Sequence, residues 1–152
     1  EELACFRLRE GERIAKVVED HLQEISELTT QAARVAGSQP GRRKVRLMKQ
    51  LEELLEEDNS LSEERISQEL ALIIARGDVR EELDRLLSHV AAARDLLAQG
   101  GAIGRRLDFL CQELNREANT LCSKSSDIEL TKLGLALKAA IERLREQIQN
   151  IE

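Results

Sequence analysis

Apolar residues recur every three or four positions along most of the chain, which is the spacing of helices that bury one face. The first such stretch runs from Ile14 to Val35 and predicts one long helix with a seam like that of a coiled coil. Residues 37–41, which read Gly-Ser-Gln-Pro-Gly, predict a tight reversal into a second helix. We therefore expect residues 1–60 to form a helical hairpin arm, followed by a compact helical domain over residues 61–152.

Four further helices are expected after this hairpin. The helical spacing covers about 63–74, 78–99, 104–121 and 126–151, and Gly, Asp and Ser residues separate these stretches. The seam of the last helix continues to the end of the chain, which predicts packing against the first helix or against another subunit. Two residue pairs have the spacing of helix N-terminal caps, Asp78 with Glu81 and Ser126 with Glu129.

Composition supports an all-α fold of about six helices and narrows the possible functions. The 152 residues include no Trp or Tyr, two Phe, one Pro and eight Gly, which is little of what strands and turns need. Two phenyl rings cannot build the aromatic platform on which single-stranded nucleic acid usually stacks. Any RNA contact made by this chain is therefore expected to be electrostatic or to use polar side chains.

Cellular location is also constrained. No apolar run approaches the roughly 20 residues that a membrane-spanning helix needs, and no signal peptide opens the chain. The three cysteines have neither zinc spacing nor a disulfide pattern, which suits a reducing compartment and buried apolar positions. We expect a cytoplasmic protein without membrane contact. The net charge of −6 argues weakly against nonspecific nucleic-acid binding by the chain as a whole.

A basic cluster of five residues follows the predicted reversal. It consists of Arg42, Arg43, Lys44, Arg46 and Lys49. Cations at a helix N-terminus oppose the helix dipole, so local stability does not explain them. Two interpretations stay open: a phosphate-binding tip on a protruding arm, or ion pairs with the acidic residues that follow between 52 and 58.

The stretch 104–121 carries two sets of polar side chains. One is a polar stripe on a single helix flank, made of Asp108, Gln112, Asn115 and Asn119. Such a stripe predicts a hydrogen-bonded site or a buried network between helices. The other set is Glu113 and Glu117, which are four residues apart and could share a divalent metal or pair with Arg116 and Lys124.

The two histidines lie in different contexts. His89 shares a helix ridge with Glu82 and Arg85, so it could be a general base, a metal ligand or a surface ion-pair partner. His21 interrupts the first seam and is expected to be a tolerated core or interface residue. The chain has no glycine-rich phosphate loop, no nucleophile elbow and no histidine pair at zinc spacing, so those enzyme classes lose support.

Residues 100–124, which read GGAIGRRLDFLCQELNREANTLCSK, closely resemble the signature GGPxGxxLDFLxQExxREANTxxSK of the YicC family. The tail 145–152 and scattered matches from Gln68 to His89 extend the resemblance over nearly the whole chain. Three departures are visible. Ala102 replaces the proline of the signature, and residues 75–78 read Ala-Arg-Gly-Asp where the family has Glu-Arg-Ala-Asp. Residues 39–48, which include most of the basic cluster, also depart from the family pattern.

The resemblance implies a function for the complete protein. Members of this bacterial family are described as stress- and stationary-phase-associated, divalent-metal-dependent endoribonucleases that assemble as hexamers. It thus implies cleavage of single-stranded RNA with Mg²⁺ or Mn²⁺ by a homo-oligomer. Members begin with a further domain of similar size that has no counterpart here, so we expect this chain to be the C-terminal part and inactive alone.

The resemblance also implies roles for matched positions. The candidate catalytic residues are His89, Glu82, Glu113 and Glu117, of which His89, Glu113 and Glu117 are the candidate metal ligands. Phosphate contacts would come from Arg85, Arg116 and Lys124, and the polar stripe would read ribose or bases or orient the ligands. Two other functions stay open: a helical oligomerisation module without catalytic activity, and RNA binding without cleavage that uses Arg42, Arg43 and Lys44.

Overall fold

A computed structural model describes the backbone of residues 2–38, 40–57 and 62–150, and the side chains in these ranges except those of 2–10, 12, 40–43, 54–57 and 63. Within this part the chain forms six helices and no strand, so the predicted all-α fold is confirmed. None of these helices is both long and apolar enough to cross a membrane. The helices are α1 (Glu2–Gly37), α2 (Pro40–Glu57), α3 (Glu63–Arg76), α4 (Arg80–Gln99), α5 (Gly104–Lys124) and α6 (Ile128–Gln149).

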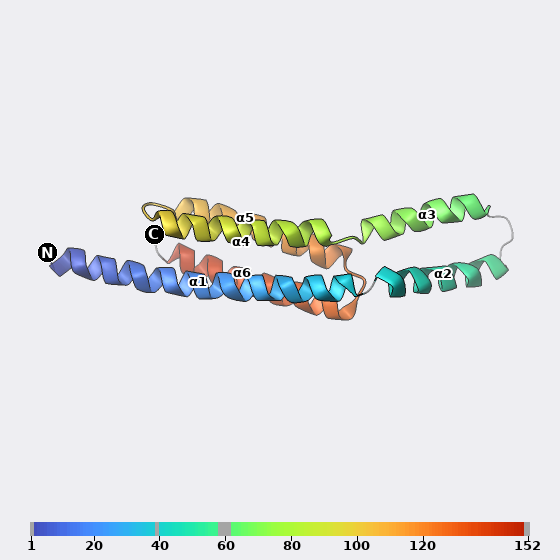
Figure 1. The fold of residues 1–152 in the computed structure, drawn as a ribbon, viewed down its shortest axis with the longest axis horizontal. Coiled ribbons are helices and arrows are strands. Elements are labelled where there is room, and N and C mark those ends of the chain that lie inside the picture. Colours follow the sequence, from blue (N-terminus) through green and yellow to red (C-terminus); the bar gives the residue numbers. More distant parts are fainter. Residues whose placement is uncertain (1, 39, 58–61, 151–152) are drawn as a thin grey trace.

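Four of the helices form an antiparallel bundle (Figure 1). Each packs on two neighbours: α1 and α5 both contact α4 and α6. The directions alternate along the chain, with α1 and α5 running one way and α4 and α6 the other (Figure 1). This is an up-down-up-down bundle in which the connection between the first and second helices has been extended by α2 and α3.

The core of the bundle comes from the faces that the apolar spacing predicts. On α1 the fully buried residues are Val18, Leu22, Ile25, Thr29 and Ala32. Thr29 is tolerated there because its hydroxyl donates a hydrogen bond to the Ile25 carbonyl at 2.7 Å. On α6 the seam packs against α1 and α5, so the expected contact with the first helix is confirmed. Its buried residues are Leu130, Gly134, Leu137, Ala140, Ile141, Leu144 and Ile148.

The predicted hairpin within residues 1–60 is wrong in its position. Helix α1 packs on α4 and α6 instead of folding back on α2, and α2 packs on α3. Figure 1 shows α2 continuing in roughly the direction of α1, with α3 returning beside it toward α4. Pro40 explains the error, because a proline at the first position of a helix starts that helix without reversing the chain. The protruding arm is therefore the α2–α3 pair.

The helix ends differ in detail from the predicted caps. The N-cap of α6 is Asp127, whose carboxylate accepts a hydrogen bond from the Leu130 amide at 2.9 Å, in place of Ser126. At α4 the Asp78 carboxylate accepts a hydrogen bond from the Arg80 amide at 3.0 Å. This amide lies two residues after Asp78, whereas a capping box would use the amide three residues after it. The α4–α5 turn contains Gly100 and Gly101, both at positive φ (67° and 82°), which L side chains rarely adopt.

Candidate functional site

One cluster of metal-ligating side chains lies between α4 and α5. It consists of His89 on α4 and of Glu113 and Glu117 on α5, and one ligand atom from each residue lies within 4.8 Å of the others. The two glutamates are one helical turn apart, so they point from the same side of α5. Because α4 and α5 are antiparallel neighbours, His89 comes level with both of them. The structure thus brings together the three residues that the sequence analysis proposed as metal ligands.

The burial of Glu117 is the notable property of this cluster. The residue is only 4% exposed, whereas His89 and Glu113 are half-buried. A carboxylate removed from water needs compensating charge or hydrogen bonds. Arg85 supplies part of this compensation, because its Nη1 lies 3.5 Å from Glu117 Oε1 while its Nη2 donates to Glu81 at 2.5 Å. The second carboxylate of the cluster belongs to Glu113, whose Oε2 lies 4.0 Å from Nη1 of the exposed Arg116.

A second buried carboxylate lies further along the same seam. Glu82 is 5% exposed, and its Oε1 accepts a hydrogen bond from Lys124 Nζ at 2.6 Å. The same ammonium donates to the Asp78 carbonyl at 3.3 Å, so Lys124 ties the end of α5 to the start of α4. Glu82 Oε2 is buried and has no hydrogen-bond partner among the described residues. The hydrogen bond to Arg80 lowers the pKa of the neighbouring Asp78 carboxyl.

The polar stripe lies on the other flank of α5. Asp108 accepts a hydrogen bond from Gln112 Nε2 at 2.8 Å and one from Nε of Arg145, on α6, at 3.3 Å. The stripe therefore faces α6, whereas Glu113 and Glu117 face α4. Among the described residues no hydrogen bond joins the stripe to the cluster, so its expected role in orienting metal ligands is not supported. Asn115 is half-buried and Asn119 is exposed on this same flank.

The basic cluster lies at the base of the α2–α3 arm, not at its tip. This follows from the position of the reversal, which joins α2 to α3 instead of α1 to α2. Lys44, Arg46 and Lys49 are exposed, and no salt bridge joins them to an acidic residue in the described part of the chain. The side chains of Arg42 and Arg43 lie outside the described residues.

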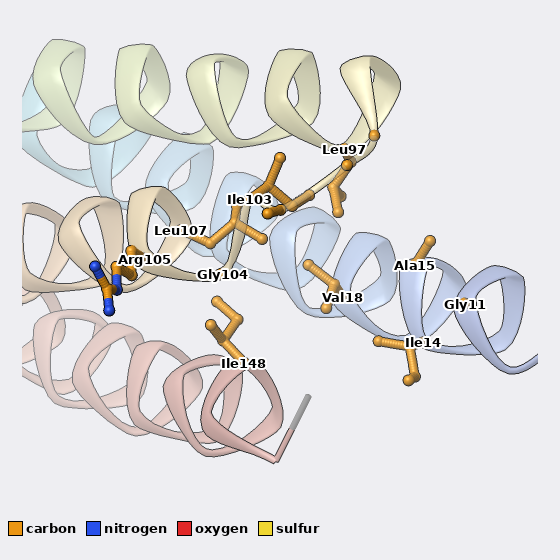
Figure 2. A pocket seen from close by; sticks show the side chains of 13 residues that line it. Gly11, Ile14, Ala15, Val18, Leu97, Ile103, Gly104, Arg105, Leu107 and Ile148 are labelled. Atoms are coloured by element: carbon orange, nitrogen blue, oxygen red, sulfur yellow. The ribbon is translucent and has the colours of Figure 1, made fainter. Parts of the chain in front are cut away.

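A cavity of about 870 Å³ opens at the end of the bundle (Figure 2). Residues of α1, α5, α6 and the α4–α5 turn line it, among them Ile14, Val18, Leu107 and Ile148. Arg105 is the one charged residue among the described residues of its lining. Cavities of this size are common ligand sites, but chemistry needs converging polar groups. Among the described residues no cluster of titratable groups lines this cavity, so we place the candidate active site at the α4–α5 cluster.

The donor set of the cluster fits a divalent metal ion. Two carboxylates and one imidazole supply three ligand atoms from two rigid helices. A cation would also compensate the buried charge of Glu117 and the repulsion between the two glutamates. Glu81, which the sequence suggested only as part of a helix cap, holds the far side of Arg85, and its spacing of four residues from Arg85 was a usable signal for this role.

The fold and the cluster define a helical protein with a candidate metal site between two packed helices. A family model described as "Endoribonuclease YicC-like, C-terminal" matches residues 32–152, and the chain belongs to this family. A relative from Haemophilus influenzae, named probable endoribonuclease YicC, is 40% identical over 148 residues. A relative of the same name from Clostridioides difficile is 35% identical over 154 residues. Each alignment covers 97% of this chain but 50% of the relative, so the chain spans about half the length of these relatives.

Proposed function

We propose that this chain is the C-terminal part of a metal-dependent endoribonuclease that cleaves single-stranded RNA, and that His89, Glu113 and Glu117 hold the metal ion. The observation that carries the proposal is the convergence of these three side chains within 4.8 Å, in a chain whose family model bears the name of an endoribonuclease. The two curated relatives carry the same activity in their names.

The chemistry of the donors favours one metal over another. Imidazole suits transition metals, while carboxylates suit Mg²⁺, Ca²⁺ and Mn²⁺, so the mixed set favours Mn²⁺ over Mg²⁺. When bound, such an ion supplies an activated water and neutralises the charge that develops on the phosphate. The nearly buried position of Glu117 limits competition from bulk water for its carboxylate.

The surrounding residues have distinct proposed tasks. Arg85 is a positioning residue, because its guanidinium contacts both Glu81 and Glu117 and so fixes the buried carboxylate. Arg116, whose side chain is 74% exposed, is the better placed of the two arginines to contact a phosphate of RNA. The Lys124–Glu82 ion pair holds the two helices in register beside the cluster.

A helical oligomerisation module is the second candidate function. It is favoured by the apolar residues that the α2–α3 arm exposes, among them Val45 (68%), Leu72 (49%) and Met48 (44%). In this alternative the arm joins copies of the protein, and the ribonuclease site lies wholly outside this chain. The two functions differ in one respect that can be measured: the ribonuclease proposal requires cleavage to depend on the α4–α5 cluster.

RNA cleavage by the complete protein, with variants of the cluster, tests the proposal. Glu117→Gln and His89→Ala are each expected to lower the cleavage rate in Mn²⁺ by about 100-fold or more, because each removes a metal ligand. The matched control is His21→Ala. That histidine also lies near a glutamate, Glu24 at 4.0 Å, but on α1, and its loss is expected to leave the rate within about twofold of the parent.

The measurement is initial-rate cleavage of a labelled single-stranded RNA, with size-exclusion chromatography and light scattering to verify assembly. Parental rates in both cluster variants would remove the site from α4 and α5 and favour the oligomerisation module. Loss of cleavage together with loss of assembly would point to a structural role of the cluster instead.

A further inference from the structure

Phe109 is an exposed aromatic side chain beside the candidate site. Of the two phenylalanines it is the one whose side chain the structure describes, and it is 59% exposed. It lies on α5 four residues before Glu113, which places the two side chains as neighbours on the helix surface. A phenyl ring left in water forgoes the stabilisation that burial would give it. Its exposure next to the cluster leaves the ring accessible to a partner outside the chain.

The neighbours of Phe109 on α5 are charged or amide side chains. Arg105 and Arg106 precede it by four and three residues, and both are exposed. In the described part of the chain no ion pair joins either arginine to a carboxylate. Gln112 follows by three residues, and the exposed Arg116 follows by seven on nearly the same face. Phe109 is thus a single ring on the solvent face of α5 with cations on both sides, of which Arg116 lies 4.0 Å from Glu113 and the two arginines before the ring have no ion pair among the described residues.

This pattern distinguishes two kinds of partner. The core of a protein interface is depleted of charge and joins several apolar side chains, which the surroundings of Phe109 do not provide. Binding of single-stranded nucleic acid instead combines aromatic rings that stack on bases with cations that contact the backbone. The ring and its flanking arginines match the second description, although one ring can hold only one base.

We propose that Phe109 stacks on one nucleobase of the RNA and thereby places a neighbouring phosphodiester at the α4–α5 cluster. The inference rests on the proposed ribonuclease function and adds the group that determines where along the strand the cut falls. Arg105 and Arg116 would contact phosphates on either side of the stacked base. Because every base has a π face, the contact fixes the position of the strand without selecting its sequence.

The experiment measures the affinity of the complete protein for a fluorescein-labelled, 2′-O-methylated single-stranded RNA, with and without Mn²⁺. Phe109→Ala is expected to weaken binding about tenfold, which is within the range for loss of one base stack. Phe109→Tyr retains the ring and is expected to bind within about twofold of the parent. The control, Leu135→Ala, removes a similarly exposed apolar side chain (56%) from α6, which packs on α1 and α5, and is expected to leave affinity unchanged.

A second set of RNAs, each with one abasic position, tests stacking directly. The parent protein is expected to lose affinity at one abasic position, and Phe109→Ala is expected to show no further loss at that position. Equal losses in parent and variant would overturn the proposal, as would a Phe109→Ala affinity within twofold of the parent. A change in assembly of Phe109→Ala, measured by light scattering, would assign the ring to a contact between copies and would also overturn it.

The proposal can fail separately from the ribonuclease function. If the parent protein cleaves RNA through the cluster and binding does not depend on Phe109, the stacking inference alone is wrong. If the parent protein neither binds nor cleaves RNA, both are wrong.

Discussion

At the scale of single residues, this bundle differs from an ordinary apolar core in its buried polar side chains. Among the described residues, three polar side chains are nearly inaccessible to solvent: Thr29, Glu82 and Glu117. The burial of Thr29 is explained by the hydrogen bond that its hydroxyl donates to a backbone carbonyl. The two glutamates both lie on the α4–α5 seam, and one oxygen of Glu82 has no partner among the described residues. Burying charge in this way costs stability, which is typical of sites kept for function.

The cysteines carry a prediction at this scale. Burial, together with the negative charge of Asp108, raises the pKa of the Cys111 thiol to about 12. At pH 8 roughly one such thiol in ten thousand is therefore ionised, and the thiolate is the form that reacts. Burial also raises the pKa of Cys122, but this side chain is only half-buried. Iodoacetamide at pH 8 is expected to modify Cys122 well before Cys111.

Peptide mass spectrometry of the folded chain over time measures the two rates. Modification of Cys111 at the rate of Cys122 would contradict the packing described for α5. The same reagent in urea supplies the control, because both thiols should then react at similar rates.

At the scale of elements, α5 packs tightly against α6 at Gly134. A Cβ atom at Gly134 of α6 would lie 2.6 Å from Cys122 Sγ and 2.9 Å from Leu121 Cδ2 on α5. Real Cβ atoms essentially never lie so close to other atoms, so a side chain at residue 134 would force those of Cys122 and Leu121 to shift. The contact matters for function, since α5 carries two of the three candidate metal ligands.

Gly134→Ala tests this contact by opposing two effects of known size. Alanine in a helix gains about 1 kcal/mol over glycine, whereas overpacking of a core costs about 1–3 kcal/mol. We expect the second effect to win and the variant to be destabilised by about 1 kcal/mol. At Gly11 on α1 an added Cβ meets no atom of the described residues within 4 Å, so Gly11→Ala should be stabilised by up to about 1 kcal/mol.

Urea unfolding followed by circular dichroism compares the two variants through their midpoints at constant slope. A Gly134→Ala midpoint at or above that of the parent would show that α5 and α6 have room at this position.

At the scale of the whole molecule, the sequence could predict the helices but not how all of them pair. Apolar spacing located the six helices and most of the core, because each bundle helix buries one stripe. The hairpin was misplaced because Pro40 and its neighbouring glycines mark the end of a helix without specifying the direction of the next one. Helix direction follows from tertiary packing, which local residues do not encode.

The same limit applies to the candidate site. The spacing of Glu113 and Glu117 predicted that they share one side of a helix. The helix ridge of His89 made it a possible metal ligand, and the resemblance to the YicC family grouped it with the two glutamates. Their convergence depends on the antiparallel packing of α4 and α5 across the Gly100–Gly101 turn, which spacing alone does not give. Spacing also could not say that the polar stripe faces α6, away from the cluster.

Isothermal titration of this chain with Mn²⁺ measures metal binding at the α4–α5 cluster, on which the proposed function depends. We predict one Mn²⁺ per chain, with binding weakened at least about tenfold in both Glu117→Gln and His89→Ala and unchanged in His21→Ala. Binding that is equal in all four proteins, or no binding to the folded parent chain, would contradict the account.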